Sequence, residues 1–280
     1  MPLVTTGEIV AEAVSARRGC GAFNAIQLEH ITAIVEGAAL ADAPVIVQLS
    51  QNAVRYHGAL APIGGAALAA ARAAEARVAV HLDHAESREL VREAVALGFG
   101  SVMFDASKLD YADNVRETRE VAAFCHDHGV WVEAELGEIG GKDGVHAPGA
   151  RTDPGEAAEF AAATGIDALA VAVGSSHAML TRDATLDFDL IARLRERVPV
   201  PLVLHGSSGV PDDGLAEAVR AGMTKVNIAT QLNKVFTAAA AGDWRAHPEH
   251  VDPRKYLGAG RDAVTTEVRR LLQLLVLTDA

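Results

Sequence analysis

Short apolar runs alternate with amphipathic stretches along almost the whole chain. Eight runs have the length and flanking residues of buried strands, at 21–25, 44–50, 78–83, 101–105, 130–136, 168–174, 201–206 and 225–230. Apolar residues at helical spacing lie between them, at 28–41, 61–76, 88–97, 111–128, 154–164, 188–197 and 212–221. Further helices are expected at 5–18, 232–241 and 261–275. The pattern therefore predicts a regular alternation of strands and helices.

The predicted strands are almost continuously apolar, which is typical of parallel strands covered on both faces. Eight strand–helix units in 280 residues predict an α/β fold, a (β/α)8 TIM barrel that forms a single domain over residues 1–280. An open doubly wound sheet is the alternative. The chain has no Gly-x-Gly-x-x-Gly after its first strand, which weakens that alternative.

Nearly every predicted strand ends in a polar residue. These residues are Asn24, Ser50, Asp83, His84, Asp105, Glu135, Ser176, His177, His205, Asn227 and Thr230. A single polar residue at such a place is usually the cap of the next helix. In barrels, however, the carboxyl ends of the strands meet on one face, and active sites lie there. So many polar residues at one rim therefore indicate a functional site.

Three histidines, His84, His177 and His205, end apolar strands in matched settings. Three imidazole ligands with one coordination position left open suit Zn²⁺. Asp83 is the direct neighbour of His84, and adjacent side chains of a regular strand diverge. We therefore interpret Asp83 as a proton donor or acceptor rather than as a second ligand from the same strand.

Carboxylates end the next two predicted strands. Asp105 and Glu135 are expected either to form a second metal position or to hydrogen-bond the histidine ligands. Glu133 faces the same way as Glu135 but lies deeper, and could support the same ligands. His81 lies on the same side of its strand as Asp83, so it either orients that carboxylate or has a structural role.

Turns rich in glycine and serine follow the last strands. In many barrels a phosphate binds there through backbone N–H groups and hydroxyls at a helix N-terminus. The candidate residues for such a site are Gly174, Gly206, Ser207, Ser208, Asn227 and Thr230. The position of these turns, rather than their composition, makes them candidates.

Composition and charge exclude several classes of protein. The chain is 50% hydrophobic and has a formal net charge of −12, so we expect no nucleic-acid partner and no anionic-membrane surface, both of which need a basic patch. Two cysteines are too few for a disulfide framework, and a cytoplasmic location is expected. We expect neither a signal peptide nor a membrane span, because no apolar run is long enough.

Six motifs make the chain resemble the class II, zinc-dependent fructose-bisphosphate and tagatose-bisphosphate aldolases over nearly its whole length. They are Gly21-Ala22-Phe23-Asn24, His81-Leu82-Asp83-His84, Ser101-Val102-Met103-Phe104-Asp105, Val132-Glu133-Ala134-Glu135-Leu136-Gly137, Val203-Leu204-His205-Gly206 and Lys225-Val226-Asn227. The resemblance implies reversible cleavage of fructose 1,6-bisphosphate to dihydroxyacetone phosphate and glyceraldehyde 3-phosphate through a zinc-stabilised enediolate. Tagatose 1,6-bisphosphate or a related phosphorylated ketose is the alternative substrate. A homodimer or homotetramer is also implied.

The resemblance implies roles for particular residues as well. The zinc ligands would be His84, His177 and His205, and Asp83 would exchange a proton with the oxygen at C4. Asn24 would contact the enediolate and Ser50 the substrate. The phosphate of dihydroxyacetone phosphate would be held by Gly206, Ser208, Asn227 and Thr230, with a monovalent cation, Na⁺ or K⁺, near it. Asp105 and Glu135 would serve a second divalent ion or the histidine ligands.

The chain departs from the family in the loop expected to close over the substrate. Many members carry Gly-Gly-x-Glu-Asp, whose glutamate moves the C3 proton of dihydroxyacetone phosphate, whereas residues 140–144 read Gly-Gly-Lys-Asp-Gly. Asp143 is the expected catalytic replacement, because the flanking glycines allow its backbone to swing inward. Glu138, nearer the strand end, is the alternative.

A second departure concerns the distal end of the substrate. The arginine that holds the distal phosphate in many members aligns with Gly258, so Arg261 is expected to bind it, with Arg254 as the alternative. Ala229 stands where one fructose-specific branch has aspartate, which leaves the stereochemistry at C4 open.

Two other functions are compatible with a barrel of this size. A non-catalytic subunit would keep the fold and lose the ligands, but all three histidines and Asp83 are present. A zinc hydrolase would need a carboxylate to activate water and would not need phosphate-binding turns. The aldolase interpretation accounts for both groups of residues.

Overall fold

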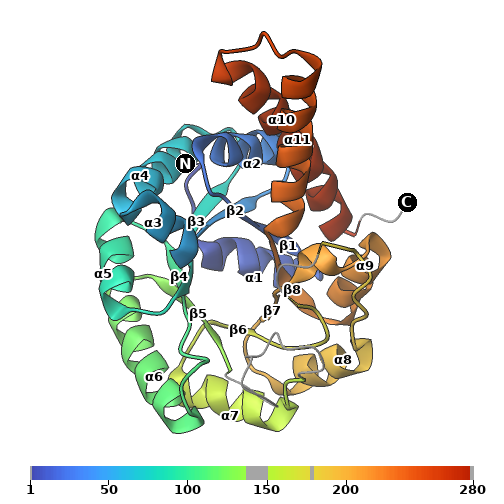
Figure 1. Ribbon diagram of the computed structural model, residues 1–280. Helices are drawn as coiled ribbons and strands as arrows, with labels where there is room; N and C mark the ends of the chain where they lie inside the picture. Colours follow the sequence, from blue (N-terminus) through green and yellow to red (C-terminus); the bar gives the residue numbers. More distant parts are fainter. Residues whose placement is uncertain (1, 137–150, 177–179, 278–280) are drawn as a thin grey trace.

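The structure is a computed structural model, and it describes residues 2–136, 151–176 and 180–277. Eight parallel strands pair in chain order and close into a barrel, with β8 beside β1 (Figure 1). The strands are β1 Cys20–Asn24, β2 Val45–Ser50, β3 Val78–Ala85, β4 Ser101–Phe104, β5 Trp131–Glu135, β6 Ala168–Ala170, β7 Leu202–Leu204 and β8 Met223–Ile228. The predicted (β/α)8 barrel is confirmed, and the open doubly wound sheet is wrong.

Helices surround the barrel on its outside (Figure 1). They are α2 Leu28–Ala41, α4 Leu60–Ala73, α5 Arg88–Leu97, α6 Tyr111–Asp127, α7 Pro154–Thr164, α8 Phe188–Arg197, α9 Asp212–Ala221 and α11 Pro253–Leu275. The bounds of α5, α7, α8 and α9 are those predicted. Side-chain caps at Ser87, Asp153 and Asp187 accept N–H groups of the first turns of α5, α7 and α8.

Two elements near the rim differ from the prediction. A short helix, α3 Gln51–His57, follows β2 and was not expected, because its few residues lack a clear apolar periodicity. Ser50 caps it by accepting the N–H of Ala53 at 3.2 Å. The strand β6 is shorter than the apolar run 168–174, whose second half continues as buried irregular chain.

The barrel interior changes from apolar to polar along its strands. At the amino-terminal end, α1 Thr6–Ala16 packs three apolar side chains, Ile9, Val10 and Ala13, against the strand residues Cys20, Ala22, Ile46 and Ala79. Figure 1 shows α1 across this end of the barrel. The carboxyl ends of the strands instead carry the polar residues Asn24, Gln48, Asp83, Glu133 and His205. The polar end is therefore where a site can form.

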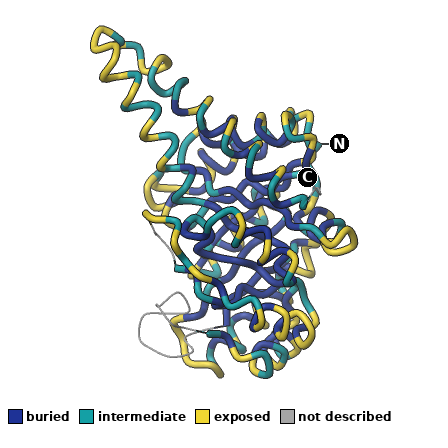
Figure 2. Tube along the Cα trace, turned by 90° about the vertical axis from the view of Figure 1, so that its right-hand side faces the viewer, coloured by how far each residue is buried: buried dark blue, intermediate teal, exposed yellow. Residues whose placement is uncertain are grey.

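The last two helices form a hairpin that projects from the barrel. The helix α10 Thr230–Ala246 runs outward, and the first part of α11 returns beside it (Figures 1 and 2). Further along, α11 packs closely on α2, where a Cβ on Gly37 would lie 2.8 Å from Thr265 O. Trp244 and Val251 are 59% and 91% exposed near the end of the hairpin. No helix among the described residues has the length and apolar character needed to cross a membrane.

Candidate active site

The carboxyl end of β3 is irregular, and this irregularity shapes the site. The register of β3 against β4 shifts between Leu82 and Ala85, and His84 adopts a left-handed backbone conformation with φ 50°. His84 consequently brings a ligand atom to within 4.8 Å of one on Asp83. Our expectation that these neighbouring side chains diverge is wrong, because it assumed a regular pleat.

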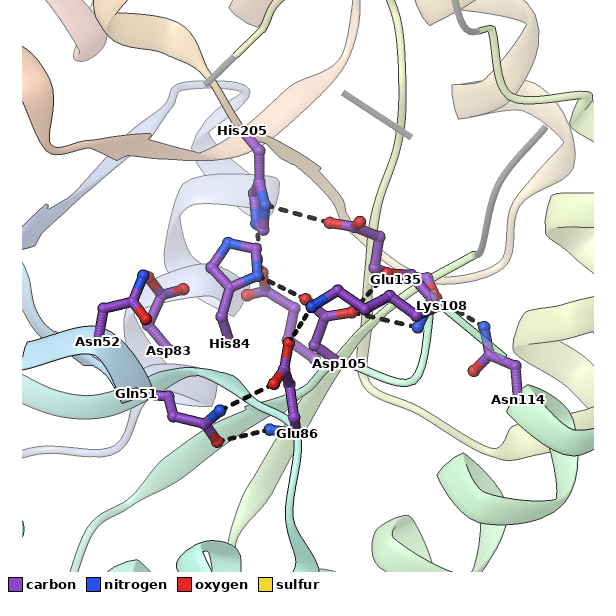
Figure 3. Close-up of polar contacts among 12 residues, drawn as sticks. Gln51, Asn52, Asp83, His84, Glu86, Asp105, Lys108, Asn114, Glu135 and His205 are labelled. Atoms are coloured by element: carbon purple, nitrogen blue, oxygen red, sulfur yellow. Dashed lines mark hydrogen bonds and ion pairs between the residues drawn. The ribbon is translucent and has the colours of Figure 1, made fainter. Parts of the chain in front are cut away.

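Asp83, His84 and His205 gather at the rim. Each offers one ligand atom, and these atoms all lie within 4.8 Å of one another; the two imidazole centroids are 4.9 Å apart (Figure 3). Such spacing allows one ion to contact all three side chains. The third predicted histidine, His177, and the predicted catalytic Asp143 lie outside the described residues.

Carboxylates hold the first imidazole in place. His84 Nδ1 lies 2.8 Å from Asp105 Oδ2, and Ser107 donates its N–H and its hydroxyl to Asp105 Oδ1 at 3.1 and 2.6 Å. Burial by itself would lower the pKa of His84, but the carboxylates of Asp83 and Asp105 overcome it and raise the pKa to about 10. The surroundings of His84 therefore strongly favour a positive charge, carried by a proton or by a metal ion.

Two glutamates of β5 flank the second imidazole. Glu133 Oε1 lies 3.0 Å from His205 Nε2, and Glu135 Oε2 lies 3.4 Å from His205 Nδ1. All three side chains are buried. Burial works against a charged imidazole, but these carboxylates outweigh it and raise the pKa of His205. Asp105 thus hydrogen-bonds the ring of His84, and Glu135 approaches His205 at ion-pair distance.

A buried ion pair lies deeper in the barrel. Lys225 Nζ is 2.8 Å from Glu133 Oε2 and donates to Asn227 Oδ1 at 2.8 Å. Burial would raise the pKa of Glu133, but the Lys225 ammonium outweighs it and holds this pKa far below its usual range. Sequence reasoning assigned no role to Lys225. A lysine in the middle of a fully buried strand was the signal that could have identified it.

His81 is part of the same buried layer. Its Nδ1 lies 2.8 Å from Ser101 Oγ, and its Nε2 lies 3.9 Å from Glu133 Oε2. Burial and the nearby Lys225 lower the pKa of His81 to about 3, so the ring is neutral. It makes no hydrogen bond to Asp83 among the described contacts, so the geometry favours the structural role over the orienting one.

Asp83 is held by a chain of amides. Asn24 donates from Nδ2 to Asp83 Oδ2 at 2.7 Å, and Gln48 donates from Nε2 to Asn24 Oδ1 at 3.0 Å. Burial would raise the pKa of Asp83, yet the charges of His84 and His205 lower it, so the carboxylate is ionised. Asp83 Oδ1 has no hydrogen-bond partner among the described residues. A buried, ionised oxygen of this kind calls for a cation or a proton.

The turn after β7 is built around a glycine. Gly206 has φ 65°, and a Cβ there would lie 2.6 Å from Ser176 O. No other residue fits without strain. Ser207 donates its hydroxyl to Asn227 O, which ties the turn to β8. Gly174 is similarly restricted, with φ 118° and Thr185 O 2.5 Å from a Cβ position.

The same turn meets the N-terminus of α10. Ser208 Oγ accepts the N–H groups of Ala229 at 3.3 Å and Gln231 at 3.1 Å. Thr230 is the first residue of α10. The predicted phosphate residues on β7, β8 and α10 are thus brought together at a helix N-terminus, the kind of place that favours an anion.

Two predicted substrate residues have other partners. Ser50 is occupied as the cap of α3. Arg261 is exposed on α11, and in the described part of the chain its hydrogen bonds, at 2.9 and 2.7 Å, both go to Asp262. The structure therefore places Arg261 on the helical layer and shows no contact between it and the strand-end residues.

The fold and the site define a barrel enzyme whose histidines and carboxylates converge at the carboxyl ends of the strands. The sequence profile of the family described as fructose-bisphosphate aldolase class-II matches residues 4–279. The chain belongs to this family and is an aldolase, a carbon–carbon lyase. Because the chain belongs to this aldolase family, the two alternative functions, a non-catalytic subunit and a zinc hydrolase, are not supported. Class II aldolases are generally zinc-dependent, which agrees with the group of ligand atoms.

Individual relatives agree with this assignment. A fructose-bisphosphate aldolase of Giardia intestinalis is 36% identical over 291 residues, covering 95% of this chain and 90% of the relative. Among solved structures, the YdjI aldolase of Escherichia coli K12 matches with a TM-score of 0.86 and 30% identity, covering 98% and 97% of the two chains. The fructose-bisphosphate aldolase of Campylobacter jejuni, with a TM-score of 0.82, 22% identity and coverage of 98% and 95%, shares the fold.

Proposed function

We propose that this aldolase is zinc-dependent and reversibly cleaves fructose 1,6-bisphosphate to dihydroxyacetone phosphate and glyceraldehyde 3-phosphate. The observation that carries the proposal is the convergence of Asp83, His84 and His205 within 4.8 Å at one rim of the barrel. The name of the Giardia relative supports fructose 1,6-bisphosphate as the substrate. Tagatose 1,6-bisphosphate or a related phosphorylated ketose is the alternative, because Ala229 leaves the preference at C4 open.

The residues present fit a zinc ion. His84 and His205 would hold it together with His177, which lies outside the described residues, and Asp105 and Glu133 would fix the two described rings. When bound, zinc would act as a Lewis acid that polarises the substrate carbonyl. A second divalent ion at Asp105 and Glu135, and Na⁺ or K⁺ near the phosphate, stay predictions.

Asp83 is the proposed proton carrier. Cleavage requires a base for the C4 hydroxyl, and condensation requires the same group to return the proton. Asn24 occupies Asp83 Oδ2, while Oδ1 has no hydrogen-bond partner among the described residues. The carboxylate therefore presents one oxygen to the substrate while Asn24 holds the other. The lowered pKa of Asp83 keeps the group ionised, which is the state that must accept the proton during cleavage.

The remaining proposals concern the residues that bind the substrate and the assembly of the protein. The triose phosphate would be held by Gly174, Gly206, Ser207, Ser208, Asn227 and Thr230. Ser50 would contact the substrate, and Arg261 would bind the distal phosphate, with Arg254 as the alternative. Asp143 would move the C3 proton.

We also propose that copies of the chain associate as dimers or tetramers, supported by the exposed Trp244 and Val251 on the projecting hairpin. A cytoplasmic location is proposed because both cysteines, Cys20 and Cys125, are buried and unpaired.

A coupled cleavage assay tests the proposal. Fructose 1,6-bisphosphate and tagatose 1,6-bisphosphate are supplied side by side, with and without a chelator, to the wild type and to His205→Ala. We expect faster cleavage of the fructose substrate, loss of activity with chelator, recovery on adding Zn²⁺, and little activity in His205→Ala. The exposed His128→Ala serves as a control and should behave as wild type. Full activity of His205→Ala, or of the chelated enzyme, would contradict the metal assignment.

A further inference from the structure

A second group of metal-type ligands lies at the end of the α10–α11 hairpin, away from the barrel rim. Among the described residues, His247, Glu249 and His250 each offer one ligand atom, and these atoms all lie within 4.8 Å of one another. We propose that this hairpin cluster, together with Asp243, is a second transition-metal site that binds Zn²⁺, Co²⁺ or Ni²⁺. Two imidazoles and a carboxylate are the ligand set that such ions prefer.

The local backbone brings the ligands together. α10 ends at Ala246, and the N–H of His247 still bonds to Asp243 O at 2.9 Å, so the helix leads directly into the cluster. The N–H of His250 then bonds to His247 O at 2.9 Å, which folds the loop into a tight turn. Both histidines consequently face each other, with ring centroids 4.6 Å apart.

The distances between ligand atoms are close to those of a bound ion. Glu249 Oε1 lies 3.6 Å from His247 Nδ1 and 4.0 Å from His250 Nε2. Ligand atoms at about 2.0–2.2 Å from a tetrahedral zinc are roughly 3.3–3.6 Å apart. Glu249 is therefore within a few tenths of an ångström of ligand spacing from both imidazoles, while the two stacked imidazoles, whose ligand atoms lie within 4.8 Å, must also turn toward the ion. His247 and Glu249 have side chains 50% and 70% exposed, so they are free to make this movement.

Asp243 gives the cluster a fixed anchor. Its Oδ2 accepts a hydrogen bond from His250 Nδ1 at 3.1 Å, and the two side chains are only 22% and 27% exposed. A proton held on Nδ1 leaves the lone pair of His250 on Nε2, the nitrogen that faces Glu249. Carboxylates orient metal-binding histidines in this way in many proteins. The cluster is therefore more organised than three side chains that share an exposed turn.

Binding would clamp the loop of the hairpin to the end of α10. Two arginines, Arg245 and Arg254, flank the cluster in sequence and are exposed. Because proteolysis of a folded protein requires local opening, a bound ion should slow tryptic cleavage at these positions. This effect gives a readout that does not depend on catalysis.

The test counts bound Co²⁺ by calorimetry and by the visible absorption of the ion. The wild type should bind about two ions per chain, and His247→Ala/His250→Ala about one, since each three-ligand site holds one ion. His205→Ala, which alters the proposed catalytic site, should keep the hairpin ion, so that failure of either site is recognised separately. Asp243→Asn should weaken binding at the hairpin about 10- to 100-fold.

Two matched controls make the result decisive. His126→Ala/His128→Ala removes two exposed histidines from the end of α6 and should change neither the number of ions nor their affinity. Co²⁺ should slow tryptic cleavage beside the hairpin in the wild type but not in His247→Ala/His250→Ala. Equal binding by the wild type and the hairpin double variant, or equal loss in the α6 control, would overturn the proposal.

Discussion

Lys225 Nζ lies 2.8 Å from Glu133 Oε2 in the barrel interior, and both side chains are fully buried. The other oxygen of Glu133 lies 3.0 Å from His205 Nε2. One carboxylate thus links a buried ammonium on β8 to an imidazole at the rim. A buried carboxylate needs a partner to stay ionised, and we infer that Lys225 keeps Glu133 charged and thereby holds the ring of His205.

Replacing the buried ammonium tests this relationship. Lys225→Met should lower the free energy of unfolding by about 3–5 kcal/mol, because it leaves Glu133 buried without its counter-charge. Urea denaturation followed by circular dichroism measures the change. The same variant should bind Zn²⁺ more weakly. Without Lys225, Glu133 no longer stays ionised, and His205 loses the charged carboxylate that holds its ring. A variant as stable as the wild type would show that the pair is not needed.

The double variant Lys225→Met/Glu133→Leu separates stability from function. Replacing both partners of a buried pair with apolar residues is often neutral for stability, so unfolding should return toward the wild-type value. The affinity for Zn²⁺ should stay low, because His205 Nε2 then lacks its acceptor. Recovery of both properties together would mean that Glu133 acts only on stability.

A second prediction concerns the carboxylate at the centre of the site. Asp83→Asn should keep the metal but reduce kcat about 10²- to 10⁴-fold, the usual range for a positioned acid–base group. Steady-state kinetics and metal analysis of the same preparation measure both quantities. Loss of the ion would instead identify Asp83 as a ligand, an outcome that its proximity to His84 and His205 makes worth testing.

A third prediction concerns the amide chain behind Asp83. Gln48 is fully buried and donates to Asn24, which donates to Asp83. Asn24→Ala removes a hydrogen bond to a charged group and should lower kcat about 10- to 100-fold, corresponding to about 1.5–3 kcal/mol. Gln48→Leu should lower kcat less, with KM almost unchanged, because it acts through Asn24. Equal KM and kcat for all three proteins would remove the chain from the mechanism.

Much of the fold was predictable because buried parallel strands are read directly as apolar runs. Sharp helix boundaries such as those of α5 and α7 followed from local signals, namely the caps Ser87 and Asp153 and the terminal glycines Gly98 and Gly165. The site was predictable in part for the same reason, since polar residues that end parallel strands must meet at one rim. His84, Asp105, Glu135 and His205 could be placed there from sequence order alone.

Other features depend on contacts that no local pattern reveals. The left-handed conformation of His84 arises where β3 shifts its register against β4. Lys225 and Glu133 come from strands far apart in the chain and meet only because the barrel closes. The polar residues Gln48 and Lys225 interrupt apolar strands on the inward-facing side, and that interruption is the sequence signal to look for.

The last prediction concerns the turn proposed to bind phosphate. Gly206 has φ 65°, and a Cβ there would lie 2.6 Å from Ser176 O and 2.9 Å from Ser176 N, so the backbone must move to accept any side chain. Gly206→Ala should lower the free energy of unfolding by about 1–3 kcal/mol and weaken competitive inhibition by inorganic phosphate.

Gly65→Ala is the matched control, because Gly65 lies exposed in α4 with nothing within 4 Å of a Cβ. It should raise stability by about 0.5–1 kcal/mol and leave phosphate inhibition unchanged. Urea denaturation and inhibition kinetics on the two variants decide the matter: if Gly206→Ala binds phosphate as tightly as Gly65→Ala does, the anion does not sit at this turn.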